Sequence, residues 1–193
     1  MEQEDSRTNG ARRRPRRHDP ARRTRVLDAT LDVLVSDGAA GITHRKVAAR
    51  ADVPLGSVTY HFASLAELQA AAFARYVALR AEEFAAAFAE VRDRAGLLDV
   101  LVAQVREVRE RRRSAVLGFE LHLAALRDPA LRALTEEWTA ASRAVLARFT
   151  GPVAAGRVDA FLEGLILHAL LAPTPEPEES TRAALAGLLD LPA

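Results

Sequence analysis

The stretch ITHRKVAARADVPLGSVTYHFASLAEL, residues 42–68, decides the fold and contains two short helical patterns on either side of a proline. The first pattern opens at Thr43, whose side chain can accept a hydrogen bond from a backbone amide of the first helical turn. Val47, Ala48 and Ala51 then recur at helical spacing. Together these residues predict a short helix with one buried face.

Pro54 ends this helix, because a proline disfavours helical geometry in the residue before it, and it begins a second helix that reaches His61. Ser64 and Glu67 then form a capping box, which opens a third helix. Two short helices joined by a tight turn are typical of a helix-turn-helix, whose second helix enters the major groove of DNA. The stretch therefore predicts a DNA-binding protein.

Composition narrows the class of protein. The chain has 193 residues, of which 49% are hydrophobic, and this is enough for a packed core. Aromatic residues make up 5%, and β-branched residues rarely alternate with polar ones, so the pattern favours helices over strands. There is no cysteine, which excludes disulfides and thiolate metal sites. No signal peptide or membrane-length apolar run is visible, so we expect a cytoplasmic protein with no membrane partner.

The charge is unevenly distributed along the chain. Residues 1–62 carry 12 Lys and Arg against 8 Asp and Glu, whereas the remainder carries 15 against 18. Basic character thus coincides with the helix-turn-helix, as it does in nucleic-acid-binding proteins. A basic tail alone also produces such a skew.

The order of the apolar patterns predicts an all-α protein of about nine helices. Residues 1–19 predict a disordered basic arm, which is either a DNA contact or a solvated tail. Residues 20–63 predict a three-helix DNA-binding domain, and residues 64–193 a helical domain for effector binding and dimerisation. Helices are expected at residues 20–37, 44–51, 54–61, 68–91, 97–108, 114–126, 129–149, 158–172 and 180–189.

Several residues of the helix-turn-helix carry a resemblance to a known family: THRKVA at 43–48, the pair Val53 and Gly56, YHF at 60–62, and Ser64 with Leu68. With these residues the chain resembles the tetracycline-repressor-like (TetR) family of one-component bacterial transcription regulators. Beyond residue 68 the resemblance is only of length and helix order. The sequence departs from the family at Leu65, where many members carry lysine, and at Thr59, where an aromatic residue is common.

The residue types of the second helix limit how DNA is read. They include no Arg, Asn or Gln for bidentate base contacts. This helix must therefore recognise bases through hydroxyl groups and through apolar contacts with thymine methyls. Arg45, in the preceding helix, is the best candidate for a guanine edge, and Lys46 for a phosphate. Thr43 is also needed as a cap, and Tyr60 either contacts DNA or packs between helices. The predicted DNA contacts are Thr43, Arg45, Lys46, Leu55, Ser57, Thr59, Tyr60 and His61.

A helix-turn-helix reads few base pairs, so we expect a homodimer on a palindromic double-stranded operator. The family resemblance implies a four-helix interface between the subunits. The helix around Trp138 and the almost wholly apolar helix at 158–172 are the candidates, although the latter is alternatively a buried central helix. The predicted interface residues are Trp138, Val145, Phe161, Leu162, Leu165, Ile166 and Ala169.

Polar residues on apolar helix faces indicate where a small-molecule effector could bind. A buried polar group needs a hydrogen-bond partner, which is either another protein group or a ligand. Aromatic residues nearby either wall a pocket or fill the core. The predicted pocket residues are Phe73, Tyr76, Gln104, Phe119, His122, Trp138 and His168.

Together these patterns predict a repressor that a small molecule releases from DNA. One alternative is a DNA-binding regulator controlled by a protein partner. A helical-bundle enzyme is a further alternative, but Glu120 with His122 and Glu163 with His168 lack the Glu-x-x-His spacing of di-iron sites. No phosphate loop or nucleophile motif is present, so we expect no catalytic residue, cofactor or metal.

Overall fold

The computed structural model describes residues 21–190, and the basic arm predicted at 1–19 lies outside them. The described chain is all-α, as predicted, with nine α-helices, one short 3-10 helix (η1) and no strand. The elements are α1 (Arg22–Asp37), η1 (Ala39–Gly41), α2 (His44–Arg50), α3 (Leu55–His61), α4 (Leu65–Ala87), α5 (Arg94–Arg106), α6 (Arg112–Ala125), α7 (Pro129–Thr150), α8 (Pro152–Leu171) and α9 (Glu178–Leu188).

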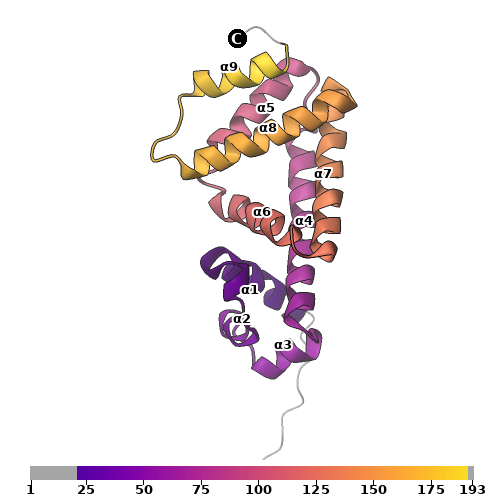
Figure 1. Cartoon of the computed structure of the whole chain (residues 1–193), viewed down its shortest axis with the longest axis vertical. Helices are drawn as coiled ribbons and strands as arrows, with labels where there is room; N and C mark the ends of the chain where they lie inside the picture. The colour runs from indigo at the N-terminus through magenta and orange to yellow at the C-terminus, as the bar shows by residue number, and fades with distance from the viewer. Residues whose placement is uncertain (1–20, 191–193) are drawn as a thin grey trace, which may run out of the picture.

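The helices form an elongated molecule with α1, α2 and α3 at one end, here called the head (Figure 1). The helix α4 runs from the head to the opposite end, where α5, α8 and α9 gather. The helix α7 packs along α4, and α6 lies between the head and the rest. Only α4 and α6 pass from the larger part of the molecule to contact α1 extensively.

The predicted helix starts around the turn are confirmed. The Thr43 hydroxyl accepts a hydrogen bond from the Lys46 amide at 3.2 Å. The Ser64 hydroxyl accepts from the Glu67 amide at 3.1 Å, while the Glu67 carboxylate accepts from the Ala63 amide at 2.7 Å. The two caps fix where α2 and α4 begin.

Most helix bounds lie within three residues of those predicted, and the largest differences are at the end of α4, which stops at Ala87 and not at residue 91, and at the start of α8. The helix α8 begins at Pro152, six residues before the predicted start at Val158. Gly151, with φ of 78°, reverses the chain directly between α7 and α8, and a proline is suited to the first helical turn. The helix α6 begins at Arg112, two residues before the predicted start, and α5 ends at Arg106, two residues before the predicted end.

Two apolar cores share the molecule, and they do not divide at residue 63. The first core joins α1, α2, α3 and the start of α4 to Leu117 and Leu121 of α6. The second joins the distal half of α4 to α5, α7, α8 and α9. Because α6 contributes side chains to the core of the head, a displacement of α6 must disturb that core. Within the described residues, no helix has the length and apolarity of a membrane span.

Candidate DNA-binding surface and effector cavity

The helix α3 presents an exposed surface and is held from behind by buried residues. Val58 is fully buried and Phe62 nearly so, whereas Tyr60 is 85% exposed and Leu55 44% exposed. Tyr60 therefore does not pack between helices, which was the alternative left open by the sequence. Its ring makes an edge contact with His61 at 5.2 Å between centroids. The phenol hydroxyl is free to meet a phosphate oxygen.

The basic residues of α2 differ in how strongly the chain holds them. Arg45 is exposed. The Lys46 ammonium instead donates to the Asp37 carboxylate at 2.6 Å and to the Gly41 carbonyl at 2.9 Å. The Lys46 hydrogen bond lowers the pKa of Asp37. Lys46 therefore ties α2 to the end of α1, and a phosphate would have to share it with Asp37.

Gly56 lies on the exposed side of α3. A Cβ built there meets no described atom within 4 Å, so none of the helices described in residues 21–190 approaches it closely. The absence of a side chain at Gly56 therefore serves no close packing among the described helices, and it leaves room for a sugar-phosphate backbone.

A cavity of about 100 Å³ lies between α4, α5, α6, α7 and α8. It joins five of the seven residues predicted for the pocket, and its walls are mainly apolar and aromatic. The lining residues are Tyr76, Arg80, Gln104, Val108, Arg111, Ser114, Ala115, Gly118, Phe119, His122, Trp138, Glu163 and Ile166.

The structure places two predicted pocket residues elsewhere. Phe73 is fully buried in the first core, because it lies on the face of α4 that packs on the head. His168 lines a different depression, between the ends of α5 and α8 and the loop before α9. Both share a helix with a true lining residue but lie at a different position along or around it.

The sequence patterns did not predict the charged lining residues Arg80, Arg111 and Glu163. Arg80 follows Tyr76 by four residues, and a helix places such a pair on one face. That spacing could have indicated Arg80 once Tyr76 was chosen. Glu163 carried no such signal, since only the packing of α8 on α7 and α5 brings it to the cavity.

Two titratable groups in the cavity are shifted by burial. Burial raises the pKa of Tyr76, whose hydroxyl donates to the Ser114 carbonyl at 2.8 Å and so joins α4 to α6. Burial also raises the pKa of Glu163, although His122, whose Nε2 lies 3.6 Å from the carboxylate, opposes the shift. Glu163 is thus a half-buried carboxylate beside His122, where a cation is favoured.

A buried polar cluster joins α7 and α8 beside Glu163. Asp159 is 6% exposed, and its carboxylate accepts from the Ser142 hydroxyl at 2.6 Å and from Arg143 Nε at 3.1 Å. Both carboxylate oxygens are therefore satisfied, as a buried charge requires. The cluster fixes how α8 lies on α7, and with it the position of Glu163.

Comparison with known proteins identifies the family. Residues 92–191 match the family model of the tetracyclin repressor-like C-terminal domain, which is more than half of the chain. The chain belongs to the TetR family. No curated protein matches it. Members of this family are transcription factors without enzymatic activity, so the TetR chain is a transcriptional regulator and not an enzyme.

Solved structures agree with the TetR assignment over almost the whole chain. A transcriptional regulator from Streptomyces coelicolor A3(2) is 39% identical, with a TM-score of 0.79, 88% of this chain covered and 99% of that one. The multidrug binding protein EbrR in complex with ethidium is 42% identical, with a TM-score of 0.75 and coverage of 89% and 99%. A TetR-family member from Streptomyces coelicolor A3 is 40% identical, with a TM-score of 0.73 and coverage of 90% and 100%.

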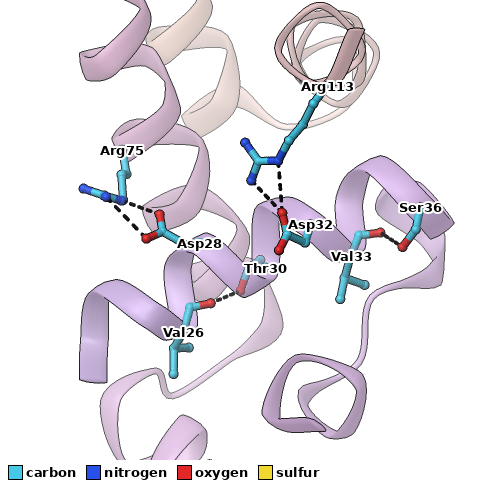
Figure 2. Close-up of polar contacts among 8 residues, drawn as sticks. All are labelled: Val26, Asp28, Thr30, Asp32, Val33, Ser36, Arg75 and Arg113. Atoms are coloured by element: carbon cyan, nitrogen blue, oxygen red, sulfur yellow. Dashed lines mark hydrogen bonds and ion pairs between the residues drawn. The ribbon is translucent and has the colours of Figure 1, made fainter. Parts of the chain in front are cut away.

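Polar contacts tie the TetR head to α4 and α6 (Figure 2). Arg75 of α4 donates to both oxygens of Asp28 in α1, at 2.7 and 3.4 Å. Arg113 of α6 donates through Nε and Nη2 to one oxygen of Asp32 in α1, at 3.0 and 2.7 Å. The Glu120 carboxylate of α6 also accepts from the Ala39 amide at 3.2 Å. The head is therefore attached to α4 and α6, two of the helices that line the cavity.

Most residues predicted for the dimer interface face the interior of the chain. Leu162 is 5% exposed, and Trp138 and Ile166 line the cavity. Val145, Leu165 and Ala169 are partly buried against the second core, and only Phe161, at 38%, is an exposed large side chain. The sequence of an apolar helix such as α8 does not show which of its faces could form a dimer interface. Its packing on α7 and α5 decides which face remains exposed.

Proposed function

We propose that this TetR-family chain is a homodimeric repressor that a small aromatic cation releases from a palindromic operator. One observation carries the proposal: a cavity with aromatic walls and a half-buried carboxylate lies between α4 and α6, the two helices that hold the head. A ligand that displaces α4 or α6 in that cavity would also displace α1, and with it the DNA-binding surface. Because the proposed partner is DNA, we place its action in the cytoplasm.

The exposed residues of α2 and α3 support DNA binding. Arg45 is free to reach a guanine edge, and Tyr60 and Thr43 are placed at the surface to donate to phosphates. The open surface at Gly56 lets a sugar-phosphate backbone come close to α3. Leu55, 44% exposed, can meet a thymine methyl.

The effector class follows from the chemistry of the cavity. Phe119 and Trp138 offer faces for a planar ring, and Glu163 offers a poorly solvated carboxylate for a positive charge. Solved structures of EbrR hold ethidium, proflavin and malachite green, which are aromatic cations. We propose that this chain binds ligands of the same class.

Effector binding would have to change the shape of the cavity. Its volume of about 100 Å³ is well below the roughly 300–1,000 Å³ of sites for drug-sized ligands. A dye-sized effector therefore binds a widened state, in which α6 moves relative to α4. Arg113 and Glu120 attach α6 to the head, so this state also changes the position of α1. The effector releases DNA because it binds that state more tightly.

The exposed face of α8 is the proposed dimer surface. Phe161, Leu167 and Leu171 are 38%, 38% and 73% exposed and follow one face of the helix. Gly164 lies on the same face, and a Cβ built there meets no described atom within 4 Å. A helix of a second subunit can therefore approach α8 closely. Pairing of such faces supports a four-helix interface with α7 and α8 of each subunit.

The test combines DNA selection with a thermal shift. Selection from a random DNA pool should return a palindrome with half-sites roughly 34–36 Å apart. Ethidium should then raise the melting temperature of the DNA-free protein, because a ligand that binds the folded state stabilises it by RT ln(1 + [L]/Kd). Glu163→Gln is the control, and it should reduce the shift.

Each negative result has its own meaning. A palindrome without any ethidium shift would overturn the effector class and favour the regulator controlled by a protein partner. Absence of an enriched sequence would overturn the proposed operator. Equal shifts for wild type and Glu163→Gln would remove Glu163 from the site.

A further inference from the structure

Arg80 reaches from α4 into the cavity and covers Trp138. Its guanidinium carbon lies 5.9 Å from the centroid of the Trp138 ring, and its Nη1 donates to the Glu83 carboxylate at 2.6 Å. The Arg80 side chain is only 16% exposed. An edge contact with Phe84, at 5.9 Å between centroids, supports the indole from another side. The aromatic face offered to a ligand is thus already in contact with a cation that belongs to the chain.

Arg80 also stands in the wall between the cavity and an outer depression of about 440 Å³ beside α1, α4 and α6. Tyr76, Arg80, Arg111 and Ser114 line both spaces. Tyr76 and Ser114 hold each other through a hydrogen bond. Arg80 contacts the indole face, Glu83, a carboxylate that is 63% exposed, and Tyr76, whose pKa burial raises and Arg80 lowers. The contacts with the indole and with Glu83 are each weak. A rotation of the long Arg80 side chain would move the guanidinium outward and join the two spaces.

We propose that Arg80 is an internal competitor of the effector: its guanidinium occupies the Trp138 face in the ligand-free chain and moves into the outer depression when an aromatic cation binds. The inference rests on the proposed function for the class of effector. Arg80 opposes cations by occupying the ring and by like-charge repulsion, but it opposes a neutral ligand only by its volume. It therefore sets the charge selectivity of the cavity as well as the affinity.

Trp138 makes the test direct, because it is the only tryptophan of the chain and reports ligand binding by fluorescence quenching. The probes are ethidium and its neutral analogue without the N-ethyl group, titrated into DNA-free protein. Arg80→Gln should tighten ethidium binding by about three- to thirtyfold, the range of a cation–π contact, and binding of the neutral analogue by less than threefold. Arg80→Lys keeps the charge and should stay close to wild type.

Arg92→Gln is the matched control, because Arg92 forms an exposed ion pair with Glu90 away from the cavity. Circular dichroism of each variant verifies that it is folded. The inference would be overturned if Arg80→Gln gained the same affinity for both probes, or gained none for ethidium. The proposed effector class would still stand in that case, provided that the wild type binds ethidium. If neither wild type nor Arg80→Gln quenches with ethidium, the proposed effector class fails and the inference fails with it. Binding of ethidium by Arg80→Gln alone would support the inference in its strongest form.

Discussion

Tyr60 separates DNA binding from folding at the scale of a single residue. Its side chain is 85% exposed and no described core residue depends on it. Tyr60→Phe removes only the hydroxyl, so the free energy of unfolding should change by less than about 0.5 kcal/mol. Operator affinity should fall by roughly ten- to 150-fold, because a hydrogen bond to a charged phosphate contributes roughly 1.5–3 kcal/mol. Urea unfolding and operator titration measure the two quantities.

Val58→Ala, two residues before Tyr60 and on the buried side of α3, is the matched control for Tyr60. It should lower stability in the urea experiment, since it removes apolar volume from the core of the head. Unchanged operator affinity in Tyr60→Phe would show that the phenol hydroxyl does not touch DNA.

Glu163 gives the cavity a pH dependence. Burial raises its pKa above the ordinary value of 4.5, so the folded state binds this proton more tightly than the unfolded state. The resulting stabilisation is full below that ordinary value and is lost as the pH rises through the folded pKa. His122 and Arg143, which lower this pKa, and Asp159, which raises it, are the charged groups nearby.

Glu163→Gln has no such proton to lose. Its stability relative to wild type should therefore increase as the pH rises from 4.5 through the folded pKa, and then level off. Urea unfolding across this pH range measures the difference, with the exposed Glu136→Gln as control. A difference that does not change with pH would show that Glu163 is not desolvated in the folded chain.

At the scale of elements, the contact of α6 with α1 should couple the cavity to the head. Arg113 and Asp32 are 52% and 39% exposed, so breaking their pair should lower stability by no more than about 1 kcal/mol. Arg113→Gln should nevertheless weaken the effect of the effector on operator affinity several-fold, because α6 then moves without pulling α1. Operator affinity with and without malachite green measures this coupling.

Arg112→Gln removes the same charge from the neighbouring position, which forms no ion pair with the described residues. Equal loss of coupling in Arg112→Gln and Arg113→Gln would indicate a general charge effect, not the link to Asp32. Asp32→Asn should reproduce Arg113→Gln, and the double variant should add nothing further.

At the scale of the whole molecule, the exposed face of α8 should hold two subunits together. Phe161→Glu combined with Leu171→Glu places two carboxylates on that face, which should dissociate the dimer at micromolar concentration. Operator affinity should fall with it, because one head alone reads a single half-site. Analytical ultracentrifugation and operator titration test both outcomes.

Leu126→Glu is the control for the dimer, since Leu126 is 71% exposed at the end of α6. It should leave the dimer intact. If it dissociates the dimer instead, the interface lies on the groove between α6 and α7.

The sequence by itself determined the elements and the head. The caps at Thr43 and Ser64, the break at Pro54 and the apolar spacing of each helix are local signals, so they act whatever the rest of the chain does. The all-α class, the number of helices in the described chain and the family resemblance followed from them. The start of α8 was predicted six residues too late, although the signal for the correct start is also local: Gly151 makes the turn and Pro152 begins the helix.

Only the tertiary structure decided the faces of the apolar helices. Phe73 and Tyr76 lie three residues apart on α4, yet one fills the core of the head and the other lines the cavity. Glu163 reaches the cavity only because α8 packs on α7 and α5, and Arg80 covers Trp138 only because α7 packs along α4. Helical periodicity places residues on a common face, but what that face meets depends on contacts between residues far apart in the chain.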